Sequence, residues 1–110
     1  MPTSLGSGTI TLASSTETNF MAADTSNKVY VLKADLSTMV GGDVVVLRIY
    51  TKAKPGGTER IAFQQTFTGV QSPDPIWYSD PIPEDVSFRA TIQATTGGLH
   101  SYDWDIITIP

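Results

Sequence analysis

The fold is decided by the stretch VSFRATIQA, residues 86–94. Apolar and polar residues alternate along it without exception: Val86, Phe88, Ala90, Ile92 and Ala94 are separated by Ser87, Arg89, Thr91 and Gln93. Successive side chains of a β-strand point to opposite faces of the sheet. The alternation therefore indicates a strand with one face on a core and the other in water.

The same pattern recurs along the chain between turns rich in Gly and Pro, and no helix-length pattern competes with it. We expect strands at residues 9–14, 28–36, 43–52, 58–68, 76–80, 86–95 and 100–109. Residues 17–26 fit either a short strand or an irregular edge. Seven or eight short antiparallel strands predict an all-β fold: a β-sandwich, jelly-roll-like or immunoglobulin-like, with a small barrel as the alternative.

The phase of the apolar residues predicts how two pairs of strands meet. In the first hairpin, Leu47 lies opposite Phe63, and Tyr50 lies opposite Arg60 as a cation–π pair. The second strand of this hairpin is expected to place its large apolar side chains on one face: Ile61, Phe63 and Phe67. In the last hairpin, the turn at Gly97-Gly98 joins two paired strands, with the following residues opposite each other: Ile92 and Trp104, Ala94 and Tyr102.

The chain of 110 residues has the size of one domain and 40% hydrophobic residues, enough for a core. Residues 1–8 are small and polar, so we expect a flexible N-terminal arm followed by a single domain at 9–110. The chain has no Cys, which excludes disulfides, thiolate metal sites and Cys nucleophiles. The N-terminus shows neither the basic region nor the apolar stretch of a signal peptide.

Charge and hydropathy exclude two classes of partner. The net charge is −4, and the seven basic residues are scattered rather than gathered into the stripe that a nucleic-acid binder needs. No apolar run approaches the ~20 residues that cross a bilayer. We therefore expect neither nucleic-acid binding nor membrane insertion.

The sequence offers no evident catalytic or metal site. The one His, His100, follows a Gly-Gly turn and is expected to face solvent at the start of a strand. Asp103 and Asp105 share one face of a strand and are expected to be solvated rather than to bind calcium. No constellation of acid, base and nucleophile is apparent, so we expect no enzyme activity and no cofactor.

Two adjacent aromatic residues, Trp77 and Tyr78, lie in a short strand between prolines. A proline cannot donate to a sheet ladder, so this strand is expected at an edge. Exposed aromatic side chains can stack on sugar rings, which makes both residues candidate ligand contacts. Neighbouring strand residues face opposite ways, so one of the two is expected to belong to the core.

Two strands are apolar on both faces, which exceeds what a two-layer sandwich requires. A strand of this kind is either central to the fold or covered by another chain. A loop or the N-terminal arm could cover the second face instead. The residues concerned form the candidate protein interface: Val44, Val46, Tyr50, Ile107 and Ile109.

Several runs resemble small structural proteins encoded by tailed bacteriophages. They are Tyr30–Met39 (YVLKADLSTM), Gly42–Lys52 (GDVVVLRIYTK), Asp74–Ser79 (DPIWYS) and the closing Tyr102-Asp103-Trp104. The resemblance spans about residues 28–107. It implies a virion component without enzymatic activity, made in the host cytoplasm, such as a capsid decoration (cement) protein.

A decoration protein clamps neighbouring subunits, so the implied partners are the major capsid protein or other virion subunits, together with further copies of the chain. Two alternatives remain open. One is a carbohydrate-binding module that uses Trp77 and Tyr78, and the other is a tail or fibre assembly subunit that forms a stable homo-oligomer.

Overall fold

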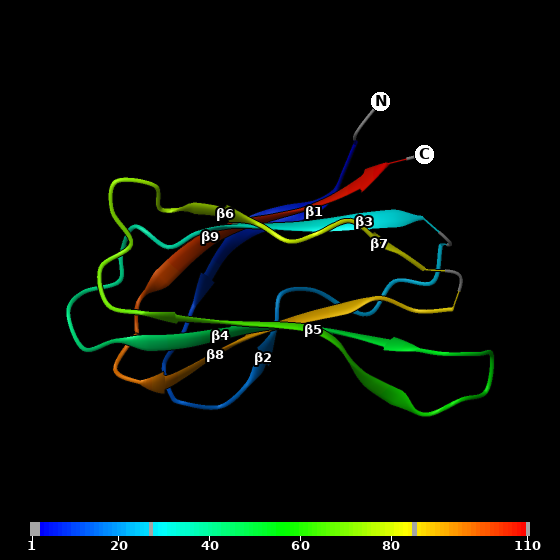
Figure 1. The fold of residues 1–110 in the computed structure, drawn as a ribbon, viewed down its shortest axis with the longest axis horizontal. Coiled ribbons are helices and arrows are strands. Elements are labelled where there is room, and N and C mark those ends of the chain that lie inside the picture. Colours follow the sequence, from blue (N-terminus) through cyan, green and yellow to red (C-terminus); the bar gives the residue numbers. More distant parts are fainter. Residues whose placement is uncertain (1–2, 27, 85, 110) are drawn as a thin grey trace.

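The computed structural model describes residues 3–26, 28–84 and 86–109 and consists of two stacked antiparallel sheets (Figure 1). Sheet A contains β1 (Thr3–Thr11), β3 (Val29–Asp35), β6 (Ile76–Tyr78), β7 (Ile82–Pro83) and β9 (Ser101–Ile109). Sheet B contains β2 (Thr18–Asn19), β4 (Val44–Lys52), β5 (Glu59–Thr68) and β8 (Arg89–Thr96). In this part of the chain no helix is long and apolar enough to cross a membrane.

The expected all-β sandwich is confirmed, and the described residues form nine strands instead of seven or eight. β2 lies in the ambiguous segment 17–26, so the additional strand is β7, whose two residues are too few for an alternating pattern. The order in sheet A is β1-β9-β3-β6, with β7 also paired to β3, and the order in sheet B is β2-β8-β4-β5. Six of the eight connections between these strands change sheet; β4–β5 stays in sheet B as a hairpin, and β6–β7 stays in sheet A.

The expected flexible arm at 1–8 is wrong for the residues that the structure describes, because β1 begins at Thr3 and pairs with β9 along its length. Residues 1–2 lie outside the described residues. A Cβ at Gly6 would lie 2.9 Å from Met21 Sδ and would force that side chain to move, whereas a Cβ at Gly8 would be in ordinary contact with the indole of Trp104 at 3.8 Å. At Gly6 the absence of a side chain therefore allows Met21 to pack against the strand.

The expected pairing of the last two strands is also wrong, because β8 belongs to sheet B and β9 to sheet A. The chain crosses between the sheets at Gly97 and Gly98, both of which have positive φ. A Cβ at Gly98 would lie 3.0 Å from Val45 Cγ2, so this crossing is packed directly against the core. Alternation states which face of a strand is buried, but not which strand lies beside it.

The hairpin formed by β4 and β5 is confirmed, with a register two residues from the one expected. Leu47 pairs with Gln65 rather than Phe63, and the Tyr50–Arg60 pair is not formed. A shift of two residues leaves every side chain on the same face, so the apolar pattern cannot distinguish the two registers. A bulge between Ile49 and Tyr50 adds one residue to β5 and turns Ile61 away from the core, where it is 49% exposed.

The core lies between the sheets and contains the inward residues of both. Leu32, Ile92 and Ile106 are completely buried at its centre. Tyr30 stacks on Phe88 with ring centroids 4.3 Å apart. Residues 17–26, ambiguous in the sequence, supply a short strand and an irregular segment that buries Phe20 and forms an isolated bridge between Asp24 and Phe88.

Candidate functional site

The structure divides the candidate interface into two surfaces. Val44, Val46 and Tyr50 alternate with core residues of β4 and lie on the outer face of sheet B. Ile107 and Ile109 alternate with buried residues of β9 and lie on the outer face of sheet A. These are opposite sides of the sandwich, so the five residues do not form one patch.

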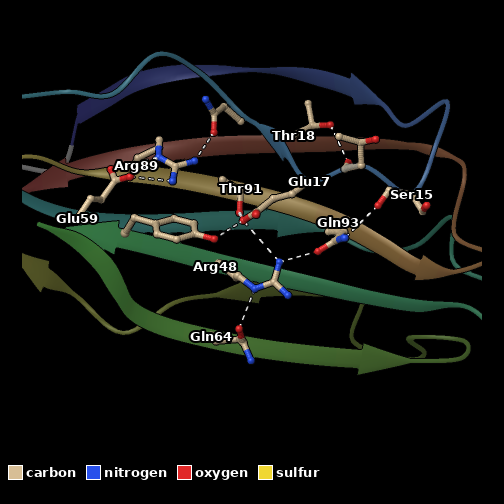
Figure 2. A network of polar contacts seen from close by, with 12 residues as sticks. Ser15, Glu17, Thr18, Arg48, Glu59, Gln64, Arg89, Thr91 and Gln93 are labelled. Carbon is tan, nitrogen blue, oxygen red and sulfur yellow. Dashed lines mark hydrogen bonds and ion pairs between the residues drawn. The ribbon is translucent and has the colours of Figure 1, made fainter.

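On the outer face of sheet B, polar side chains connect β8, β4 and the segment that precedes β2 (Figure 2). Glu17 is the centre of this network. Its Oε2 accepts hydrogen bonds from Thr91 Oγ1 at 2.5 Å and Tyr50 Oη at 2.6 Å, and lies 3.5 Å from Arg48 Nη1. Thr91 is completely buried, so the carboxylate satisfies a hydroxyl group that has no access to water.

Two arginines extend this network across the sheet. Arg48 donates to Gln64 Oε1 at 2.8 Å and to Gln93 Oε1 at 2.7 Å. Arg89 forms an ion pair with Glu59 at 2.9 Å, and its guanidinium lies 4.0 Å from the ring centroid of Tyr50. The cation–π contact expected for Tyr50 therefore exists, with Arg89 in place of Arg60.

The protonation of Glu17 reflects these contacts. Partial burial raises the pKa of its carboxyl group, but hydrogen bonds from Thr91 and Tyr50 and the charges of Arg48 and Arg89 outweigh it. The net result is a pKa below the ordinary value, so the carboxylate is ionised at neutral pH. The outer face of sheet B is thus held together by the chain's own groups, and Val46 is only 6% exposed.

The outer face of sheet A is polar over one half and apolar over the other. In the apolar half, Ile107 pairs with Val31, and Ile109 pairs with Val29. In the polar half, Thr9 donates to Asp103 and Ser4 donates to Asp105, each at 2.6 Å. A shallow depression of about 430 Å³ covers this polar half, lined by Ser7, Gly8, Thr9, Lys33, Asp35, Ile76, Asp103, Trp104 and Asp105.

The two candidate aromatic residues have different environments, as the alternation predicts. Trp77 points inward and contacts Phe67 and Phe63 of sheet B, with ring centroids 5.3 Å and 5.9 Å apart. Tyr78 points outward, is 57% exposed, and has the ammonium of Lys33 5.8 Å from its ring centroid. Only Tyr78 is available to a ligand.

One surface was not expected from the sequence. Among the described residues, four of the six large exposed hydrophobic side chains lie on β5, β6 and the connection between them: Ile61, Val70, Ile76 and Tyr78. We call this surface the β5–β6 side. Ile61 was expected in the core, and only the bulge in β5 turns it outward, so periodicity contained no signal for it.

A buried carboxylate holds the loops at one end of the sandwich. Asp43 Oδ2 accepts a hydrogen bond from the backbone N–H of Val40 at 2.9 Å and lies 3.1 Å from His100 Nε2. The bond from Val40 is the largest cause of a pKa for Asp43 below its ordinary value. His100 is therefore half-buried and paired rather than simply facing solvent.

Among the described residues, no group of three or more His, Asp or Glu side chains is arranged to hold a metal ion. Comparison of the chain with protein families, with curated proteins and with solved structures finds no match.

Proposed function

We propose that this protein is a non-enzymatic structural subunit that assembles with other protein subunits through the β5–β6 side. The observation that carries the proposal is that four large hydrophobic side chains are exposed there. Their exposed fractions range from 46% for Ile76 to 62% for Val70. Single exposed apolar residues are ordinary on soluble proteins. Four of them on two edge strands and the connection between these strands are typical of a contact surface.

The surface has a rigid support, which suits a protein contact. Trp77 sits between the sheets and contacts Phe63 and Phe67, so β5 and β6 are joined by an aromatic cluster beneath the exposed residues. A surface that is already ordered loses little conformational entropy when it binds.

More specifically, we propose that this protein is a capsid decoration protein of a tailed bacteriophage, which binds the major capsid protein or other virion subunits. The resemblance to small phage structural proteins supports this form, and a tail or fibre subunit would use the same kind of contact. The test begins with quantitative mass spectrometry of particles purified from a phage that encodes the chain. A fixed ratio to the major capsid protein is expected, and absence from the particles would contradict the virion assignment.

The surface is then tested by rebinding of purified chain to particles from which it has been removed. Replacing Ile61 and Ile76 together by Ser is expected to reduce rebinding at least tenfold. Val40→Ser is the matched control, because Val40 is equally exposed (51%) but belongs to the loop before β4. Equal loss in both variants would show that the β5–β6 side is not the contact.

A second function, glycan binding, is favoured by the depression on sheet A. Three carboxylates, two hydroxyl groups and Lys33 line it, and β-strand pairing places the exposed Tyr78 beside Lys33. A sugar-binding site needs hydroxyl and carboxylate groups that form hydrogen bonds and an aromatic ring on which the sugar ring stacks. On a glycan array, Tyr78→Ala should abolish binding while Ile61→Ser leaves it unchanged; no binding by the native chain would remove this function.

A further inference from the structure

We propose that two copies of this chain associate through the free edge of β5, which pairs antiparallel with β5 of the second copy and continues sheet B across a two-fold axis. The inference deepens the proposed function and rests on it, because it names a partner for part of the β5–β6 side. The experiments below are chosen so that the two can fail separately.

The edges of the two sheets differ in how they are protected. An unpaired edge offers a row of free N–H and C=O groups to another strand, and short or irregular edge strands prevent this. At their edges β2, β6 and β7 have only two or three residues. β1 is longer but is interrupted by a bulge between Ser4 and Gly6.

β5 has none of these protections along its second half. Residues 63–68 pair with β4 without a register shift, and within the described residues no strand pairs with their other edge (Figure 1). The side chain of Gln71 bonds the carbonyl groups of Thr68 and Gly69 and so closes one end. The regular segment that remains open to a partner is 63–67.

The side chains of this segment are complementary to themselves in one register. With Gln65 on the two-fold axis, Phe63 lies opposite Phe67 of the second copy, and Gln64 lies opposite Thr66 of the second copy. Both phenylalanines are on the core side of sheet B, so each pair of aromatic rings continues the aromatic cluster around Trp77. Aromatic pairs directly opposite each other are among the favourable cross-strand contacts.

Charge and exposure also favour a second copy of the chain over other partners. The chain has no charged residue from Ile61 to Pro73, so self-pairing brings no like charges together. The same register places Ile61 opposite Gly69 of the second copy, next to Val70. Ile61 and Val70 are 49% and 62% exposed in the single chain, so pairing brings the two exposed aliphatic residues at opposite ends of β5 to the same place.

The register is tested first by cross-linking, which is clean because the chain has no Cys. Gln65→Cys places two thiols opposite each other on the axis, within the ~5 Å between Cβ atoms of a cross-strand pair. On mild oxidation this variant is expected to form a covalent dimer. Thr96→Cys, at a site that is also exposed but lies on the interior strand β8, is the control and should stay monomeric.

Charge substitution tests the same contact in solution, with mass measured by light scattering over a concentration series. Gln65→Lys and Gln65→Glu should each raise the dimer dissociation constant at least tenfold, because like charges then face each other across the axis. An equimolar mixture of the two should restore association as a heterodimer. Thr96→Lys adds the same charge elsewhere and should change nothing, and circular dichroism verifies that each variant is folded.

The proposal is overturned if the native chain remains monomeric up to about 1 mM, a concentration at which even weak specific pairing is populated. It is also overturned if a dimer forms but the mixture of charged variants behaves like each variant alone. The native chain could be monomeric while the Ile61 and Ile76 double variant still loses particle binding. In that case the proposed function stands, and the partner at β5 is a strand of a different protein.

Discussion

The outer face of sheet B and the β5–β6 side both involve the pair of strands β4 and β5. On the first surface polar side chains are paired within the chain, and on the second apolar side chains are exposed to solvent. On the outer face, Glu17 pairs with Arg48 and accepts a hydrogen bond from the buried hydroxyl of Thr91. Arg89 pairs with Glu59 and donates to Asn19. On the β5–β6 side, Ile61 and Val70 stay exposed, and the edge of β5 is unpaired within the described residues. The polar groups of the first surface are paired within the chain, whereas the second surface keeps apolar side chains exposed, and we propose that another molecule binds there.

The network on sheet B accounts for the apolar outer residues of β4 without a partner. A strand such as β4, apolar on both faces, suggested that its outer face waits for a partner. Instead the chain covers that face with a polar network, in which Tyr50 contributes a hydroxyl donor and an aromatic ring. The alternative, that a part of the chain itself covers the face, is the one that the fold uses.

The largest effect is expected at the support of the β5–β6 side. Trp77→Ala removes the ring that packs between Phe63 and Phe67, and should lower the free energy of unfolding by about 3 kcal/mol. Urea denaturation measures this. Tyr78→Ala, the adjacent and outward-facing residue, is the control and should change stability little; a similar loss in both would mean that Trp77 does not support this side.

The next effect concerns the centre of the network on sheet B. Glu17→Ala leaves the buried hydroxyl of Thr91 and the phenol of Tyr50 without their acceptor, and should cost about 2 kcal/mol. Thermal and urea unfolding provide the measurement, with Ser14→Ala as a control in the same segment. A loss below about 0.5 kcal/mol, the range of ordinary surface substitutions, would contradict a structural role.

The same network should make stability depend on pH in a defined direction. The pKa of Glu17 in the folded protein lies below its ordinary value of 4.5. Its contribution is therefore fully present above about pH 4.5 and is lost as the pH falls through the lower folded-state pKa. The difference in unfolding free energy between the native chain and Glu17→Gln should be constant near neutral pH and shrink below pH 4.5. Other carboxyl groups are common to both proteins and cancel in the difference.

The smallest effect on stability is expected for the exposed residues of the β5–β6 side. Ile61→Ser should change the free energy of unfolding by less than about 0.5 kcal/mol, because the side chain is already half in water. Its effect should instead be seen in association, as weaker self-pairing in light scattering. A large loss of stability with unchanged association would place Ile61 in the core of the domain after all.

Sequence patterns predicted most strands correctly, from the one at 28–36 to the one at 100–109, because alternation depends only on neighbouring residues. They also predicted that Trp77 and Tyr78 face opposite ways. The five residues of the candidate interface do not form one patch, because they belong to β4 and β9, which lie in different sheets. No local pattern states which sheet a strand enters.

The amino-acid sequence therefore determines which residues of each strand face inward, since a period of two is a property of the extended backbone. Three features depended on the tertiary structure. The chain crosses between sheets at Gly97 and Gly98, Gly6 and Gly8 lie in a strand against Trp104, and a bulge turns Ile61 outward. Each arises from contacts between residues far apart in the chain, and such contacts decide neighbours, register and the surface left free for a partner.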